Sequence, residues 1–348
     1  MSTFPASNSL NRIAAVTLRV ESNSLEHLEN YYINKIGFKK IDELNQASKV
    51  STLSLPQDIY SGTGHTSAVL KLNPVAKSGF SSGKTSDIYW KIGLQLHDVD
   101  SAAVKMGYAP GSQFKDIGYM RHIQDPAGFP IELLQTTFEA NEKDRQSLFG
   151  EDDKNKYQQL MKEQFSDRRS SITGQQPLII GQITIRISDD KKSLEFYQDI
   201  LGMKLISIQD VSDYGFRLFF LVYTTDEPPH NDLNDVSIRE WLWQRRYTQL
   251  ELQWKFHSTK LTHNGYQSTD EDAVHLPSGL DSIQIEINDT SILNRVMKHD
   301  SFMPMPNKEQ MALGADEDNH YVLGAIRDPD GCNIEIITSN KSTDKCPM

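Results

Sequence analysis

Alternation of polar and apolar residues is the clearest pattern in the second half of the chain. Gln182, Thr184 and Arg186 alternate with three isoleucines, and this period of two is typical of a strand with one packed face and one wet face. Over residues 191–201 the apolar positions recur at helical spacing instead, and Gly202 follows as a helix-ending residue. The alternation then resumes, so this stretch predicts a strand, a helix and a second strand.

Three further segments repeat the strand pattern. Residues 250–253, 282–287 and 333–336 each place isoleucine or leucine on one face and polar side chains on the other. Residues 327–331 have the Asp-Pro-x-Gly form of a tight turn that leads into the last strand. Helices and strands therefore share one unit.

The first half of the chain repeats this succession. Residues 89–108 align by eye with 280–299, and residues 124–133 align with the later turn and strand at 327–336. A repeat of about half the chain predicts two similarly folded domains, which we place at residues 10–138 and 178–340.

Residues 139–177 separate the two predicted domains. They are rich in charged and amide side chains and end in a run of Ser, Thr, Gly, Gln and Pro. A partial apolar stripe favours a connecting helix packed on one domain, while the charge density leaves a solvated linker as the alternative.

The C-terminal half resembles the glyoxalase I family of the vicinal oxygen chelate superfamily, which includes lactoylglutathione lyases. The resemblance rests on the order and spacing of several segments, namely QITIRI, KKSLEFYQDILGMKLI, LELQW, PSGLDSIQI and DPDGCNIEII. It implies an α+β fold of tandem glyoxalase/bleomycin resistance domains, in which paired βαβββ modules curl a sheet into a cup. It also implies a carbon-sulfur lyase that acts on a thiohemiacetal or a similar molecule with vicinal oxygens.

The resemblance also implies a metal site in the cup. Gln182, Glu251, Ser282 and Glu335 occupy the ligand positions in the C-terminal half, and a divalent ion such as zinc, nickel or manganese would bind there. Glu335, or Glu251 opposite it, would move a proton between adjacent carbons. Ser282 stands where the family has a histidine, which predicts weak metal binding that Ser282→His would strengthen.

The equivalent positions of the N-terminal half are Ala15, Lys71, Lys91 and Glu132. If modules pair within each half, the C-terminal cup keeps its four candidate ligands. If modules exchange between the halves, Gln182 and Glu251 meet Lys91 and Glu132, while Ser282 and Glu335 meet Ala15 and Lys71. A lysine beside a carboxylate can replace a bound cation, so exchange predicts two metal-free cups.

Glutathione is the co-substrate that the resemblance implies. Arg186 stands where the family contacts the glutamyl carboxylate of glutathione, although an arginine on a strand also serves in interface ion pairs. Two other contact positions of the family are changed, to Lys255 and Ser278. The sequence therefore predicts either a metal-dependent lyase or a binding protein of the same fold that has lost the metal and the activity. An extradiol dioxygenase is disfavoured, because Gln182 and Ser282 stand where its iron-binding histidines would be.

Composition limits the classes of binding partner and the cell compartment that we expect for this protein. The formal net charge of −11 disfavours nucleic-acid binding. No apolar run reaches the length of a membrane span, and the N-terminus lacks the order of a secretory signal. We expect a cytoplasmic protein that binds a small molecule, and a homodimer stays open. Cys332 and Cys346 are expected to be unpaired thiols. Five histidines are each expected to be surface residues rather than ligands, namely His97, His122, His257, His263 and His275. His122 has more weight as a candidate than the others, because its strand is one that can point into the N-terminal cup.

Overall fold

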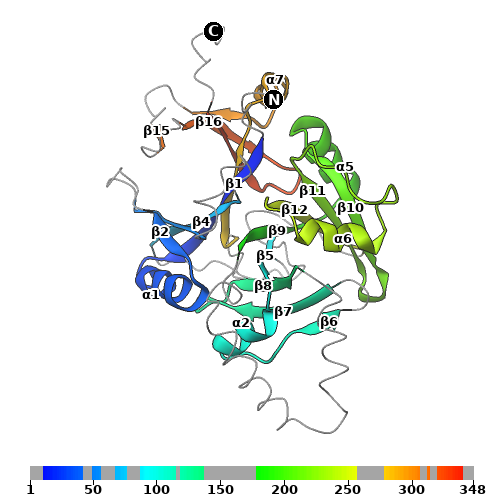
Figure 1. Ribbon diagram of the computed structural model, residues 1–348. Helices are drawn as coiled ribbons and strands as arrows, with labels where there is room; N and C mark the ends of the chain where they lie inside the picture. Colours follow the sequence, from blue (N-terminus) through cyan, green and yellow to red (C-terminus); the bar gives the residue numbers. More distant parts are fainter. Residues whose placement is uncertain are drawn as a thin grey trace, which may run out of the picture.

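The computed structural model contains two β-sheets with helices on their outer sides (Figure 1). It describes residues 11–41, 49–55, 67–76, 87–114, 118–136, 178–256, 278–305, 312–313 and 320–339. The segment predicted as a connecting helix, residues 139–177, lies outside these ranges, as do His257, His263, His275 and Cys346.

The N-terminal half consists of two modules, each with a strand, a helix and further strands. Module 1 comprises β1 (Arg12–Glu21), α1 (Leu25–Tyr31), the π-helical turn η1 (Tyr32–Ile36), β2 (Lys39–Ile41), β3 (Ser51–Ser54) and β4 (Val69–Val75). Module 2 comprises β5 (Tyr89–Leu96), α2 (Val99–Lys105), β6 (Ser112–Phe114), β7 (Gly118–Gln124) and β8 (Pro130–Gln135).

The C-terminal half repeats this order with an added helix. Module 3 comprises β9 (Ile179–Ile187), α5 (Asp190–Glu195), η3 (Phe196–Ile200), β10 (Lys204–Val211), η4 (Ser212–Tyr214), β11 (Phe216–Val222), α6 (Val236–Trp243) and β12 (Gln249–Lys255). Module 4 comprises β13 (Leu280–Glu286), α7 (Thr290–Met297), β14 (Met303–Pro304), β15 (Ala312–Leu313), β16 (His320–Arg327) and β17 (Asn333–Thr338).

Each sheet combines one module from each half. The first sheet has the strand order β14-β16-β17-β13-β1-β4-β3-β2, with β15 beside β16, and so joins modules 4 and 1. The second sheet has the order β10-β11-β12-β9-β5-β8-β7-β6 and joins modules 3 and 2. Of the two pairings that the sequence left open, the structure therefore shows exchange between the halves. Both sheets are mixed, which confirms the predicted α+β fold of paired modules.

Antiparallel pairing of central strands makes both joints. In the first sheet β1 pairs with β13, with Val16 opposite Ile283. In the second sheet β5 pairs with β9, with Ile92 opposite Ile183. Inside each module the first and last strands are parallel, as for β5 with β8 and β9 with β12. The four strands at the centre of each sheet are thus fixed by both halves together.

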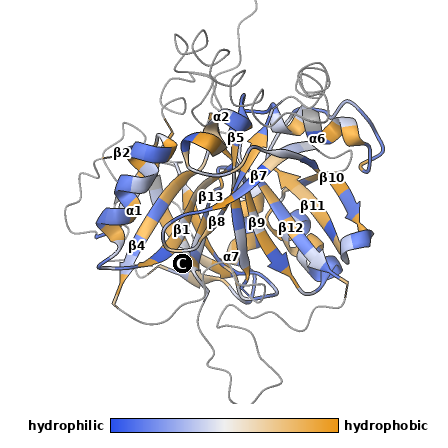
Figure 2. Ribbon diagram, turned by 90° about the horizontal axis from the view of Figure 1, so that it is seen from below, coloured by the Kyte–Doolittle hydropathy of each residue, from blue (hydrophilic) through white to orange (hydrophobic). Residues whose placement is uncertain are grey.

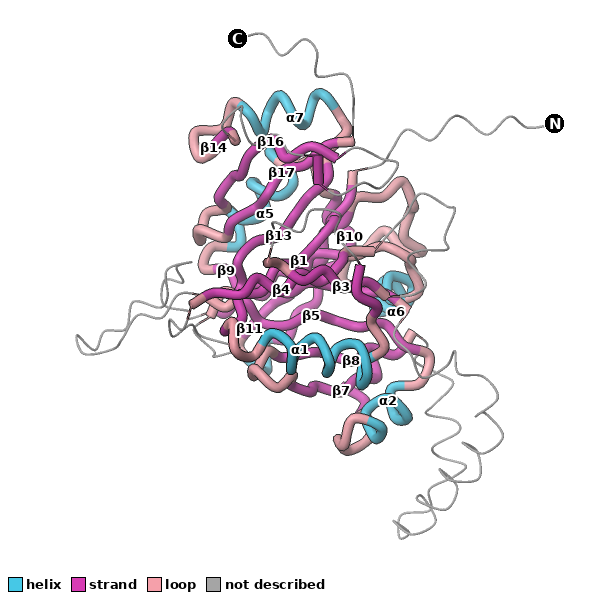
Figure 3. Tube along the Cα trace, turned by 90° about the vertical axis from the view of Figure 1, so that its left-hand side faces the viewer, coloured by secondary structure: helices cyan, strands magenta, loops and turns pink. Residues whose placement is uncertain are grey.

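Aspartates begin four of the five described α-helices. Each accepts a hydrogen bond from a backbone N–H in the first turn of its helix, namely Asp98 in α2, Asp189 in α5, Asp235 in α6 and Asp289 in α7. A side-chain oxygen at this position satisfies an amide that has no partner within the helix. Figure 3 shows α1, α2 and α7 at the periphery of the strands.

The apolar faces of the strands form a core that draws on all four modules. One continuous cluster of buried side chains contains, for example, Leu18, Leu94, Ile185 and Ile285, one from each module. Figure 2 shows the alternation along the strands as bands of hydrophobic and hydrophilic colour. None of the described helices is long and apolar enough to cross a membrane.

The polar face of β9 differs from its prediction. The alternation predicted a face in contact with water, but all nine residues of the strand are buried, including Gln182, Thr184 and Arg186. Alternation indicates that the two faces of a strand lie in different environments. It does not show whether the polar face contacts water or a buried polar site. The polar side chains of β9 therefore lie within a buried site.

Two Asp-Pro-x-Gly turns support the alignment of the repeat. Gly128 and Gly331 both have φ of 87°, a conformation that glycine adopts without steric cost. Their amides donate to the carbonyl oxygens of Asp125 and Asp328, each at 2.9 Å. The predicted equivalence of the two turns, and with it that of Glu132 and Glu335, is confirmed.

Candidate functional site

A buried polar cluster lies at the centre of the second sheet. Lys91 on β5, Glu132 on β8, Gln182 on β9 and Glu251 on β12 are exposed by only 1–3% of their surface. Four neighbouring strands thus each contribute one side chain, and two of the strands come from each half of the chain. Each of these groups requires hydrogen-bonding or charged partners, because an unpaired polar group is costly to bury.

Strand register explains how these side chains meet. Gly93 on β5 pairs with both Glu132 on β8 and Gln182 on β9. A Cβ at Gly93 would lie 2.3 Å from the Cγ atom of Gln182, so only glycine leaves room for that side chain. The absence of a side chain at this position allows the amide of Gln182 to reach across the joint between the halves.

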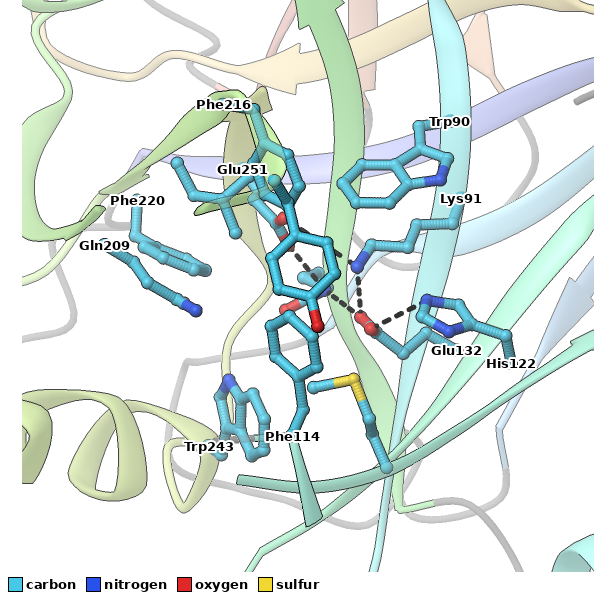
Figure 4. Close-up of a pocket in the computed structure, with 14 residues that line it drawn as sticks. Trp90, Lys91, Phe114, His122, Glu132, Gln209, Phe216, Phe220, Trp243 and Glu251 are labelled. Carbon is cyan, nitrogen blue, oxygen red and sulfur yellow. Dashed lines mark hydrogen bonds and ion pairs between the residues drawn. The ribbon is translucent and has the colours of Figure 1, made fainter. Parts of the chain in front are cut away.

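The ammonium of Lys91 lies between two carboxylates. Its Nζ atom is 2.6 Å from Oε2 of Glu132 and 3.8 Å from Oε1 of Glu251. His122 on β7 approaches the other oxygen of Glu132, with Nε2 3.0 Å from Oε1 (Figure 4). The Lys91 ammonium also lies 4.1 Å from the ring centroid of Trp90, which adds a cation–π contact.

The amide of Gln182 completes the cluster. Its Nε2 atom donates to Oε2 of Glu132 and to Oε2 of Glu251, both at 2.6 Å. Its Oε1 atom accepts from Nε2 of Gln249 at 3.4 Å. Thr184 donates to the same Oε2 of Glu251 at 3.1 Å. Gln182 therefore presents its two amide hydrogens to the carboxylates and its oxygen elsewhere.

The two carboxylates differ in proton affinity because their surroundings differ. Burial raises the pKa of Glu251 to about 7, against the weaker opposing effect of Lys91, and the nearby Glu132 carboxylate raises it further. Burial also disfavours the charged form of Glu132, but the Lys91 and His122 side chains outweigh it and lower the pKa of Glu132 to about 2. Glu132 is thus the ionised partner of Lys91, and Glu251 titrates near neutrality.

An apolar cavity of about 190 Å³ opens above this cluster. Figure 4 shows aromatic rings around it and the charged groups gathered on one side. Its walls come from strands β5, β6, β7, β10 and β11 and from the 3-10 turn η4 and helix α6. Besides the cluster and His122, the lining residues are Trp90, Phe114, Met120, Gln209, Tyr214, Phe216, Leu218, Phe220 and Trp243.

Arg186 lies beside the cavity in a structural environment. Its Nη1 atom donates to the carbonyl oxygens of Asp87 at 2.7 Å and Tyr89 at 2.9 Å. Its guanidinium carbon is 5.6 Å from the ring centroid of Trp90. Burial lowers the pKa of Arg186 to about 10, while Asp87 raises it. These contacts connect β9 to the start of β5, and Arg186 is absent from the described lining of the cavity.

Glu335 and Ser282 lie in the other sheet. Ser282 donates to Oε1 of Glu335 at 2.8 Å, and Gln284 donates to its Oε2 at 3.2 Å. Lys71 reaches Oε1 of Gln284 at 3.5 Å. The set Gln182, Glu251, Ser282 and Glu335 predicted as one metal site is therefore divided between two sheets, because the modules exchange. The prediction that Glu251 and Glu335 face one cup as a catalytic pair is therefore wrong.

The second-sheet cluster does not fit a divalent metal. The ammonium of Lys91 stands 2.6 Å from Glu132, where it supplies the positive charge that a bound ion would supply. Gln182 directs hydrogens, which repel a cation, toward both carboxylates. Across the described residues no group of three or more His, Cys, Asp and Glu side chains could hold a metal ion. Zinc in particular requires such a set of nitrogen, sulfur and oxygen donors.

The structure also places the other candidate residues that the sequence analysis named. His122 is half exposed and contacts Glu132, in agreement with its predicted orientation. His97 is exposed and lies 3.2 Å from the hydroxyl of Thr136, and Cys332 is a buried free thiol. Ser278 donates to Asp87. Sequence reasoning missed the aromatic walls, because their residues belong to β5, β6, η4, β11 and α6, whose spacing gives no sign that they converge.

Residues 179–336 match the model of a known family, described as the Glyoxalase/Bleomycin resistance protein/Dioxygenase superfamily. Glyoxalase I of Saccharomyces cerevisiae is 24% identical over 170 residues, which cover 49% of this chain and 48% of that protein. Lactoylglutathione lyase of Pseudomonas putida is 27% identical over 164 residues, which cover 46% of this chain and 84% of that protein. The match thus spans about half the length of the yeast relative.

Solved structures resemble the whole chain. Glyoxalase I from Zea mays aligns with a TM-score of 0.57 and 17% identity over 94% of this chain and 92% of that chain. A protein from Bacillus subtilis described as a putative dioxygenase aligns with a TM-score of 0.52 and 13% identity over 96% of this chain and 86% of that chain. At these identities the likeness concerns the fold.

Proposed function

Because this chain is a two-domain relative within the glyoxalase and dioxygenase superfamily, we propose that it is a metal-independent member that binds a small organic molecule in the cavity beside Lys91. Of the two functions that the sequence left open, this is the one without a metal. The superfamily supports the fold in this proposal, and the residues of this chain support the chemistry.

The observation that carries this proposal is the position of the Lys91 ammonium. It lies 2.6 Å from Glu132 and 3.8 Å from Glu251, and all three groups are buried. In this low-dielectric setting a lysine cation compensates the carboxylates directly. A divalent ion would have to displace a paired lysine and reverse the amide of Gln182 before it could bind.

Glutathione fits this site poorly as a co-substrate. Nη1 of Arg186, the candidate contact for its glutamyl carboxylate, is hydrogen-bonded to two backbone carbonyls. Ser278, at another contact position, is engaged with Asp87. The described lining of the cavity is dominated by apolar and aromatic side chains, which favours an uncharged ligand.

Metal-independent proton transfer is a second candidate, and one observation favours it. Glu132 and Glu251 share the amide of Gln182, yet the pKa of Glu132 is lowered to about 2 and that of Glu251 is raised to about 7. A pair of acids whose pKa values are driven apart is typical of general acid–base sites. Glu251, which helps to line the cavity, would be the group that accepts and returns a proton.

Metal analysis together with a turnover assay tests the proposal. The purified protein is incubated with zinc, nickel or manganese, separated from free ions, analysed for metal and assayed for hemithioacetal turnover. We expect no stoichiometric metal and no metal-stimulated turnover. Bound metal at one ion per chain, with activity that a chelator removes, would refute the metal-independent function and restore the lyase.

A further inference from the structure

Oε1 of Glu251 is a buried carboxylate oxygen that has no hydrogen-bond partner among the residues that the structure describes. Nζ of Lys91 lies 3.8 Å from it. That separation is too long for a direct hydrogen bond. The other oxygen, Oε2, already accepts from Gln182 and Thr184. A buried carboxylate oxygen without a donor is costly, so this atom marks a place for a ligand's donor.

The cavity that Glu251 helps to line suits aromatic rings. Trp90, Phe114, Tyr214, Phe216, Phe220 and Trp243 all line the cavity, and aromatic rings bind one another through stacked and edge-to-face contacts. The cavity volume is about 190 Å³. An engineered apolar cavity of about 150 Å³ binds benzene in another protein, so one or two fused rings match this volume.

We propose that the cavity binds a hydroxylated aromatic molecule of one or two rings, whose hydroxyl group lies between Oε1 of Glu251 and Nζ of Lys91. This inference rests on the metal-independent function and names its ligand class. A hydroxyl group donates one hydrogen bond and accepts others, so it satisfies the carboxylate oxygen and the ammonium at the same time.

The charges of the cluster exclude two other classes. Two carboxylates face one ammonium among Lys91, Glu132 and Glu251, so a ligand carboxylate at this position would be repelled. A primary ammonium would meet the Lys91 cation at close range. A neutral hydroxyl avoids both repulsions, and its hydrogen bond to the ionised form of Glu251 is stronger than one between neutral groups.

Calorimetry with a matched pair of probes tests the proposal. The probes are 2-naphthol and 2-methoxynaphthalene, which share their rings and differ in the hydroxyl hydrogen. We expect the wild-type protein to bind 2-naphthol at least tenfold more tightly than the methyl ether. In Glu251→Gln the ratio should fall below threefold, because the acceptor loses its charge, while affinity for the ether changes little.

A wall variant separates the ring contacts from the hydroxyl contact. Trp243→Leu should weaken both probes by a similar factor and leave their ratio above tenfold. Equal affinity for the two probes in the wild type would overturn the hydroxyl contact. Failure of both probes to bind would overturn the aromatic ligand class, although the metal-independent function would stand if the wild type also binds no metal. Stoichiometric metal in the wild type would instead remove that function.

Discussion

At the scale of residues, the site depends on one lysine. Lys91 pairs with Glu132 at 2.6 Å, and their side chains are exposed by 4% and 1%. Removal of one partner from such a buried pair leaves an uncompensated charge, whereas apolar replacement of the pair is far less costly. The charge balance of the cavity therefore rests on this pair.

Glu132→Gln tests this dependence. We expect the free energy of unfolding to fall by about 3–5 kcal/mol, because Lys91 loses its close partner. In the double variant Glu132→Gln with Lys91→Met, the loss should be smaller than in Glu132→Gln alone. Chemical denaturation of the wild type, the two single variants and the double variant measures this coupling.

An exposed ion pair of the same sheet provides the control. Arg217 and Asp210 lie 2.7 Å apart, with side chains exposed by 36% and 42%. Asp210→Asn should cost no more than about 1 kcal/mol, because solvent screens such pairs. Equal losses in Asp210→Asn and Glu132→Gln would show that burial contributes nothing to the role of Lys91.

The sequence predicted part of this site. The resemblance placed Gln182 and Glu251 in a cup, and the exchange pairing placed Lys91 and Glu132 beside them. The pairing itself could not be chosen, because both arrangements satisfy the same strand patterns. The alternative that placed Glu335 in one cup with Gln182 and Glu251 was wrong, because it required the modules to pair within each half. The lining residues Phe114 and Trp243 gave no signal, since their convergence depends on the tertiary fold.

At the scale of elements, one tyrosine in each half of the chain connects the two sheets. Tyr32 of η1 in module 1 donates to Oδ2 of Asp125 in module 2, and Tyr197 of η3 in module 3 donates to Oδ2 of Asp328 in module 4, both at 2.9 Å. Each aspartate begins one of the Asp-Pro-x-Gly turns. The helices and turns were predictable from period and turn residues, but these contacts between modules were not.

Tyr197→Phe tests this connection. Burial, and then the neighbouring Asp330, raises the pKa of Asp328 to about 7, while the hydroxyl of Tyr197 helps to lower it. Loss of the hydroxyl should lower the free energy of unfolding by about 1.5–3 kcal/mol, because the acceptor is a buried carboxyl. The pKa of Asp328 should rise further, which NMR titration of the carboxyl carbon measures.

Tyr223→Phe is the matched control. Tyr223 donates to the neutral carbonyl oxygen of Leu201 at 2.7 Å, so its removal should cost about 0.5–1.5 kcal/mol. The pKa of Asp328 should not change in this variant. A larger loss in Tyr223→Phe than in Tyr197→Phe would contradict the importance of the tyrosine–aspartate contact.

At the scale of the whole molecule, exchange of modules makes the halves interdependent. Residues 11–136 contain β1 and β5, whose partners β13 and β9 belong to the other half. Strand edges without partners associate with other strands. A repeat of half the chain was visible in the sequence, but repetition alone does not decide whether copies fold separately or together.

Separate expression of residues 1–138 and 178–348 tests this interdependence. We expect each half alone to aggregate or self-associate, since its central strands lack their partners. The two halves produced together should copurify and recover the near-ultraviolet circular dichroism of the intact chain. A half that is folded and monomeric by analytical ultracentrifugation would contradict the account. The same measurement on the intact chain decides whether it forms the homodimer that the sequence left open.

Buried acids make stability depend on pH. Burial raises the pKa of Glu251 and of Asp328 to about 7 and that of Asp125 to about 6. The folded state therefore holds more protons than the unfolded state above about pH 4. These raised pKa values contribute to the free energy of unfolding. The contribution is fully present below the pKa that the acids have in the unfolded chain, and it is lost as the pH rises through about 6–7.

Urea unfolding at pH 5, 6, 7 and 8 measures this dependence. We expect the free energy of unfolding to decrease from pH 5 to pH 8, and the decrease to be smaller in Asp328→Asn. Glu132 acts in the opposite direction, because its lowered pKa removes stability only as pH falls below about 4. Stability that rises from pH 5 to pH 8 would contradict the assignment of the buried acids.

The central claim is that Lys91 takes the place of a metal ion. Calorimetric titration with nickel and zinc tests it most directly, in the wild type and in the variants Lys91→His and Ser282→His. Lys91→His removes the ammonium and adds an imidazole beside Glu132, Gln182 and Glu251, a donor set suited to these ions. Ser282→His adds an imidazole to a cluster whose one described carboxylate is Glu335. We predict micromolar or tighter binding in Lys91→His alone. Micromolar binding by the wild type, or binding in Ser282→His but not in Lys91→His, would contradict the claim.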